Sequence, residues 1–113
     1  MSEDRYMHSQ DNPKLIAILD LTTAPEDRRA AVSALEQARP AVRAMPGCTN
    51  FRVYASTENN TDLAVVHEWA DEASFGAYLE SDAFARSGAA LRPLLTAAPV
   101  SRRFRAELID LVN

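Results

Sequence analysis

The sequence TNFRVYASTENNTDLAVVHEW, residues 49–69, decides the fold of this chain. Apolar and polar side chains alternate on both sides of the polar segment 58–61, which is the pattern of two strands joined by a turn. The second strand, 62–69, has two faces: one carries Leu63, Val65, His67 and Trp69, and the other carries Ala64, Val66 and Glu68. We therefore expect a β-hairpin within an antiparallel sheet.

A strand and a helix flank the hairpin on each side. Segment 14–21 has the pattern of a strand that is apolar on both faces, and segment 23–45 carries apolar residues at helical spacing. After the hairpin come two helical segments and a strand, which are expected to begin at Asp71, Ser81 and Arg102. The order β-α-β-β-α-β predicts an α+β fold of the ferredoxin-like type, one antiparallel sheet with its helices on one face.

Several element boundaries are expected from local signals. Thr23 and Glu26 form the pattern of a capping box at the start of the first helix, and Pro40 is expected to kink or split that helix. The last strand is predicted over 102–108, or over 102–112 if the apolar segment 109–112 extends it.

The second face of the predicted sheet has no helices to cover it. Ile16, Ile18 and Val66 are expected on this face, and an apolar sheet surface of that size predicts a partner. The simplest closed arrangement is a homodimer in which two sheets stack through these open faces. Asp20 and Arg52 are expected to belong to the same interface, with the arginine compensating the carboxylate.

Composition limits the classes of partner. The chain has 113 residues, a net charge of -4 and no run of basic residues, so a nucleic-acid partner is not expected. No segment is apolar enough to span a membrane, and the single cysteine, Cys48, predicts a cytoplasmic protein. Residues 1–13 are predicted to be a flexible N-terminal tail, or else an arm that reaches a partner subunit, and residues 14–113 to form one domain.

Three motifs resemble those of a known family. Met45-Pro-Gly-Cys48, Val65-Val-His-Glu-Trp69 and Tyr78-Leu-Glu-Ser-Asp-Ala-Phe84 are similar to segments of antibiotic biosynthesis monooxygenase domains. The resemblance covers about residues 14–108, and it implies a dimeric α+β barrel with a pocket between sheet and helices. Family members include enzymes that oxidise polycyclic phenols with O2 and no cofactor, heme-degrading enzymes, isomerases and proteins with no known activity, so the resemblance implies a fold more strongly than a reaction.

The resemblance and the strand pattern together suggest catalytic residues. Trp69 matches the tryptophan that lines the family pocket, and His67 lies on the same strand face, where its near-neutral pKa suits removal of a phenolic proton. Tyr78 is predicted to donate a hydrogen bond to the substrate. Each of the three has a purely structural alternative. Trp69 can be a core residue, His67 a buried histidine bonded to a neighbour, and Tyr78 a half-buried aromatic residue on a helix.

Other residues are candidates for binding the substrate or for filling the pocket. They are Phe75, Phe84, Leu21 and Arg92, the last of which can reach an anionic group of a ligand or can be simply solvated. The family's heme-degrading enzymes place a histidine where this chain has Tyr78 and an asparagine where it has Leu21, so heme degradation is not expected. No metal-ligand spacing or nucleotide-binding loop is present in the sequence, and neither a metal nor a cofactor is expected.

Two functional hypotheses follow. The first is a cofactor-independent monooxygenase of a hydrophobic phenol or quinol, with His67 as the base. The second is a ligand-binding or isomerase-type dimeric barrel without oxidative chemistry. An open apolar cavity with His67 and Tyr78 directed into it favours the first, and a pocket filled by Phe75, Phe84 and Leu91 favours the second.

Overall fold

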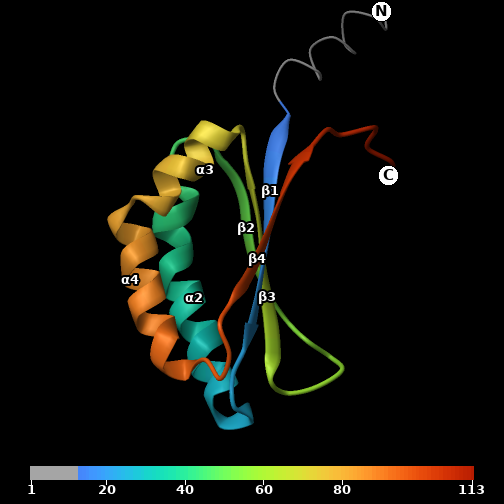
Figure 1. Cartoon of the computed structure of the whole chain (residues 1–113). Helices are drawn as coiled ribbons and strands as arrows, with labels where there is room; N and C mark the ends of the chain where they lie inside the picture. Colours follow the sequence, from blue (N-terminus) through green and yellow to red (C-terminus); the bar gives the residue numbers. More distant parts are fainter. Residues whose placement is uncertain (1–12) are drawn as a thin grey trace, which may run out of the picture.

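The chain forms a four-stranded antiparallel sheet with all its helices on one face, as the computed structural model of residues 13–113 shows (Figure 1). The strands are β1 (Lys14–Thr22), β2 (Cys48–Ala55), β3 (Asp62–Trp69) and β4 (Val100–Ala106), in the order β2-β3-β1-β4. The helices are α2 (Arg28–Arg43), α3 (Glu72–Leu79) and α4 (Asp82–Leu91), with 3-10 turns η1 (Pro25–Asp27) and η2 (Arg92–Leu94). The predicted ferredoxin-like α+β fold is confirmed.

The register of the sheet follows from the alternation in the sequence. Ile18 lies opposite Val66 and Val53 lies opposite Val65, so each strand turns one set of side chains to the helices and the other set away from them. The helix-facing set forms the core with the apolar stripe of α2; its members include Leu15, Ala17, Leu21, Phe51, Val65, Trp69, Ala31, Leu35 and Val42. The core therefore lies between the sheet and the helices.

The predicted capping box at the start of the first helix is wrong. The Thr23 N–H donates to the carbonyl of Thr61 at 2.9 Å, and Thr23 also bridges to Leu95, so it continues the strand instead of capping a helix. Its hydroxyl donates to the Ala24 carbonyl, and the chain passes through η1 before α2 begins. The hydrogen bond from Thr23 to Thr61 extends the sheet by one residue, and Thr23 is therefore not available as the helix cap that the local sequence predicted.

The remaining helix signals have a mixed outcome. Pro40 does not split the helix, because α2 runs unbroken through it to Arg43. The predicted cap at Asp71 is confirmed, because its carboxylate accepts from the Ser74 N–H at 2.8 Å. The helix restarts at Ser81 as predicted, and the Ser81 hydroxyl caps it by accepting from the Phe84 N–H at 3.1 Å.

A tight turn at Gly47 joins α2 to β2. Its φ of 84° lies in the left-handed region, and a Cβ at this position would lie 2.2 Å from Ser74 Oγ. The Gly47 carbonyl accepts from the Ala70 N–H at 2.7 Å, so the turn also holds the end of β3 beside α3. Only glycine fits this position.

The face of the sheet away from the helices remains uncovered within residues 13–113. Beside the half-buried β1 and β3 residues it presents Tyr54, Val100 and Phe104, which are 50%, 55% and 46% exposed. Within the described residues the carboxylate of Asp20 lies 3.2 Å from Arg102 of β4 and not beside the expected Arg52, and the place of both residues in an interface stays a prediction. The uncovered surface is thus apolar with an ion pair on it.

The C-terminal boundary differs from the prediction. β4 spans Val100–Ala106, so neither the predicted end of the strand at Leu108 nor its extension over 109–112 is present. Ile109 is 96% exposed, because β1, which pairs with β4, begins at Lys14 opposite Ala106 and reaches no further along the chain. The predicted tail, apart from Pro13, lies outside the described residues. None of the helices in residues 13–113 has the length and apolar character needed to cross a bilayer.

Candidate functional site

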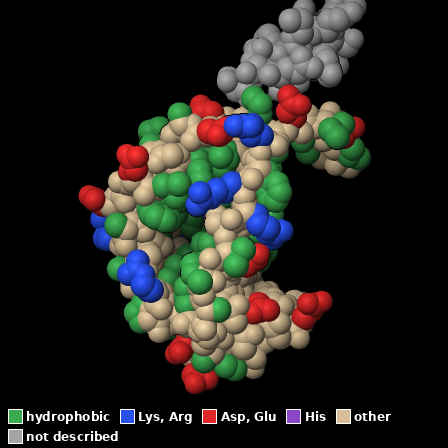
Figure 2. All heavy atoms as spheres, viewed as in Figure 1, with side chains coloured by type: hydrophobic (Ala, Val, Ile, Leu, Met, Phe, Trp, Pro, Cys, Tyr) green, Lys and Arg blue, Asp and Glu red, His purple; other side chains and the backbone are tan. Residues whose placement is uncertain are grey.

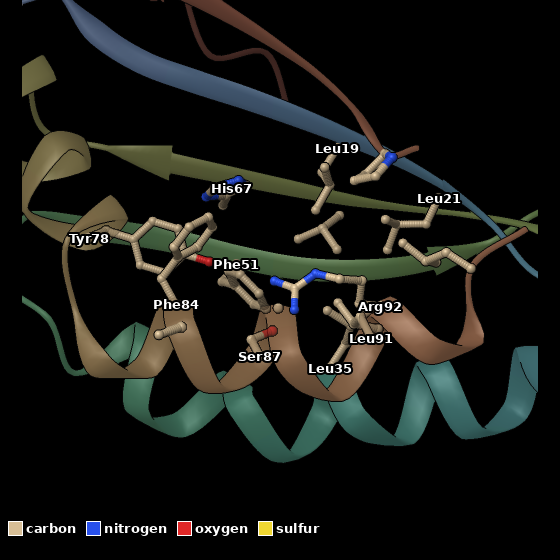
Figure 3. Close-up of a pocket in the computed structure, with 15 residues that line it drawn as sticks. Leu19, Leu21, Leu35, Phe51, His67, Tyr78, Phe84, Ser87, Leu91 and Arg92 are labelled. Carbon is tan, nitrogen blue, oxygen red and sulfur yellow. The ribbon is translucent and has the colours of Figure 1, made fainter. Parts of the chain in front are cut away.

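A cavity of about 260 Å³ lies between the sheet and α4 (Figure 3). Its walls are mostly apolar and come from strands β1, β2 and β3 and from helices α2 and α4; they include Leu19, Leu21, Leu35, Phe51, Val65, Phe84 and Leu91. Helix α4 presents Ala85, Ser87 and Gly88 to this space, and these side chains are too small to fill it. Figure 2 shows the opening as an apolar hollow between the helices and β4, with Lys and Arg side chains around it.

An aromatic cluster forms the wall of the cavity near α3. The rings of Trp69 and Tyr78 stack with centroids 5.0 Å apart and an angle of 28° between their planes. His67 meets Tyr78 edge-on at 5.7 Å and Phe51 edge-on at 5.5 Å. This packing fixes the imidazole and the phenol against each other, because each is held by rings on more than one side.

The hydrogen bond between Trp69 and His67 defines the state of the imidazole. Trp69 lies two residues after His67 on β3, and its indole N–H donates to His67 Nδ1 at 2.9 Å. An imidazole nitrogen that accepts a hydrogen bond carries no proton, so neutral His67 carries its proton on Nε2. Burial, with a smaller contribution from the Arg103 guanidinium, lowers the pKa of His67 from 6.5 to about 4, which keeps the ring neutral at pH 7.

The Tyr78 hydroxyl is a free donor at the same wall. Within residues 13–113, Tyr78 is hydrogen-bonded only through its backbone, whose carbonyl accepts from Ser81, and Figure 3 shows the phenol oxygen directed into the cavity. Burial, with a smaller contribution from Cys48, raises the pKa of Tyr78 from 10.0 to about 12. The phenol is therefore protonated at neutral pH and can donate to an acceptor inside the cavity.

The structure separates the predicted site residues into two groups. His67, Tyr78, Phe84, Leu21 and Arg92 line the cavity together. Trp69 and Phe75 do not line it. Trp69 is fully buried, and both rings lie behind His67 and Tyr78 as the support of the cavity wall. The functional roles proposed for these residues remain predictions.

Sequence reasoning missed part of the lining. Leu19 and Val65 share the strand faces of Leu21 and His67, so the alternation contained the signal for them. Ser87 and Gly88 gave no such signal, because small residues on a helix do not reveal that they face an unfilled space. No group of three or more His, Cys, Asp or Glu side chains in residues 13–113 is arranged to hold a metal ion.

Comparisons with known proteins agree with this geometry. Residues 14–89 match the sequence profile of the family described as "Antibiotic biosynthesis monooxygenase". No protein of curated function matches the chain in sequence. Among solved structures, a conserved protein from Methanosarcina mazei Go1 has a TM-score of 0.80 at 22% identity, covering 89% of this chain and 98% of its own.

Two further structures are similar and have names that refer to the family. A putative antibiotic biosynthesis monooxygenase from Caulobacter crescentus CB15 has a TM-score of 0.79 at 18% identity, covering 90% of this chain and 97% of its own. A protein of the same description from Nitrosomonas europaea has a TM-score of 0.80 at 10% identity, covering 85% and 92%. At these identities the likeness shows the fold.

Proposed function

Because the chain belongs to the antibiotic biosynthesis monooxygenase family, we propose that it is a cofactor-independent monooxygenase of a small hydrophobic phenol or quinol. The observation that supports this proposal is an apolar cavity with two free hydrogen-bond donors, on His67 and Tyr78, in its aromatic wall. The cavity is larger than the roughly 150 Å³ apolar cavity that accepts benzene, so it has room for about two fused rings.

The proposed reaction uses the substrate as its own reductant. A ring CH2 that is activated by a neighbouring phenol or enol loses both hydrogens and gains one oxygen atom as a carbonyl. The second atom of O2 leaves as water with those two hydrogens. All four electrons come from the substrate, so no flavin, heme or metal is needed to balance the step.

The role of the protein in this step is to favour the anionic, oxidisable form of the substrate. Donation from the Tyr78 hydroxyl and from His67 Nε2–H to a substrate oxygen stabilises negative charge as the phenol ionises. The general-base role predicted for His67 has a physical argument against it, because Trp69 occupies the one nitrogen that could accept a proton. We therefore propose His67 as a donor, with Leu21 and Phe84 as apolar walls for the ring.

O2 consumption with a panel of anthrones and quinols tests the proposal. We expect a protein-dependent rate with at least one compound, and a decrease of about tenfold in Tyr78→Phe, since one hydrogen bond to a charged oxygen is lost. Tyr54→Phe is the matched control, because Tyr54 lies on the opposite face of the sheet and its loss of a hydroxyl leaves the cavity intact. Ligand binding without O2 consumption would instead support the ligand-binding barrel.

The proposed enzyme is a homodimer formed through the open sheet face. Its support is the exposed apolar surface made by Tyr54, Val100 and Phe104, which is unusual for a protein that remains a monomer. We expect sedimentation equilibrium to give twice the chain mass at micromolar concentration, and Phe104→Asp to shift the protein toward the monomer. A wild-type protein that sediments as a monomer would contradict this arrangement.

A further inference from the structure

Arg92 places an unpaired positive charge at the cavity. It follows α4 in η2, and its guanidinium folds back over Gly88, where Nη2 would lie 3.5 Å from a Cβ on that glycine (Figure 3). Within residues 13–113 no carboxylate lies within 4.0 Å of this guanidinium. In the same residues Arg92 forms hydrogen bonds through its backbone alone: its N–H donates to the Gly88 carbonyl and its carbonyl accepts from the Leu95 N–H. Five N–H donors are therefore free beside an apolar cavity.

The rest of the opening carries no compensating charge. None of the residues that line the cavity is acidic. A second guanidinium, that of Arg103 on the neighbouring edge strand β4, lies 5.1 Å from the centre of the Phe75 ring and has no carboxylate partner in residues 13–113. The whole chain has a net charge of -4, so this positive region is local and is not a general property of the surface.

An apolar cavity that offers N–H and O–H donors from Arg92, Tyr78 and His67, with no carboxylate in its lining, selects a ligand with acceptors. The neutral donors, Tyr78 and His67, suit a phenolic or carbonyl oxygen on the ring. The planar fork of Arg92 suits a carboxylate, which it can bind through two parallel N–H···O bonds. We propose, on the basis of the function proposed above, that the substrate is a hydroxylated aromatic carboxylate whose carboxylate binds Arg92 while its ring oxygen faces Tyr78 and His67.

Two matched compounds test this inference without any oxidation. They are 6-hydroxy-2-naphthoate and 2-naphthol, which share the fused rings and the hydroxyl and differ in the carboxylate. Calorimetric titration under nitrogen is expected to show that the wild-type protein binds the naphthoate roughly tenfold more tightly, the size of effect of one charge-assisted contact near solvent. Arg92→Gln is expected to abolish that preference and to leave the affinity for 2-naphthol within about twofold.

Arg86→Gln is the control variant. Arg86 lies on α4 and is exposed, and it does not line this cavity, so its replacement removes one positive charge six residues before Arg92 without touching the site. Arg92→Lys is expected to recover part of the preference, because the charge remains while the fork is lost. Equal preference for the naphthoate in wild type and in Arg92→Gln, or an equal loss in Arg86→Gln, would overturn the inference.

The binding experiment separates this inference from the proposed reaction. Arg92-dependent binding of the naphthoate supports the anionic ligand even if no compound in the O2 assay is oxidised, in which case only the monooxygenase proposal fails. If neutral quinols are oxidised but the naphthoate is not preferred, the proposal of an anionic substrate is refuted and the proposal of a monooxygenase is retained. Failure of both naphthalene compounds to bind overturns the ligand class.

Discussion

Acid should destabilise this protein through the buried imidazole of His67. The pKa of His67 is lowered to about 4 in the folded chain, mainly by burial, whereas the unfolded chain has the ordinary value of 6.5. Between these two values the unfolded state binds a proton that the folded state does not, so stability falls as the pH decreases. The loss begins near pH 6.5 and is complete near pH 4.

The magnitude follows from the two pKa values. Each pH unit between them corresponds to about 1.4 kcal/mol, so the full loss is about 3 kcal/mol, and about 2 kcal/mol of it occurs between pH 7 and pH 5. The geometry agrees with this sign, because a protonated imidazole has no acceptor left for the Trp69 indole N–H. The carboxyls of Asp62 and Asp71 have lowered pKa values, so their contribution is lost only at more acidic pH.

Urea unfolding at pH 7, 6 and 5, at one protein concentration, measures this loss. The reference is His67→Asn, whose Oδ1 can take the place of Nδ1 as acceptor from Trp69 but does not titrate. The two proteins differ only at position 67, so the difference between them reports on His67. We expect the wild type to lose about 2 kcal/mol more than the variant between pH 7 and pH 5. Parallel losses in the two proteins would refute the burial and hydrogen bonding deduced for His67.

Two further predictions concern the frame of the site. Gly47→Ala should cost about 2 kcal/mol or more in urea unfolding, because the turn requires a left-handed φ that strains alanine and the new Cβ would meet Ser74. Gly76→Ala in α3 meets nothing within 4 Å and should be neutral or stabilising, so equal effects of the two substitutions would contradict the turn geometry. Leu35→Ala should cost about 3 kcal/mol, because Leu35 is 1% exposed and lines the cavity, and the exposed Leu108→Ala should change stability by less than about 0.5 kcal/mol. A small loss for Leu35→Ala would mean that the wall collapses into the cavity.

The strands could be predicted from the sequence because a period of two dictates which side chains share a face. That rule predicted that His67 and Trp69 share one face of the sheet and that Ile18 and Val66 share the other. The burial of His67 and Trp69 confirms the first pair, and the strand register confirms the second. Helix starts were less predictable where two uses of the same backbone compete. Thr23 could cap a helix through its side-chain oxygen or extend the sheet through its backbone N–H, and only the position of Thr61 in space decides between them.

The cavity could not be predicted, because it is set by the volume that side chains leave empty. The sequence contains Ser87 and Gly88 without any sign that they face the sheet across a gap. The partners of the β4 arginines could not be predicted either. Arg102 pairs with Asp20 on one face of the sheet, and Arg105 pairs with Glu72 on the other, and neither pair is apparent from the sequence. Such partners depend on distances between elements far apart in the chain.

The chemistry proposed for His67 changes because of a neighbour only two residues away. A histidine and a tryptophan at positions i and i+2 of a strand lie on the same face, close enough for the indole N–H to reach the imidazole, as it does here at 2.9 Å. Since an indole can only donate, it converts the nearer imidazole nitrogen into an acceptor and directs the proton to the other nitrogen. The arrangement that suggested a catalytic base from the sequence therefore yields, once its hydrogen bond is seen, a fixed donor toward the cavity. A donor at this position, beside the protonated Tyr78, suits a substrate that reacts as an anion.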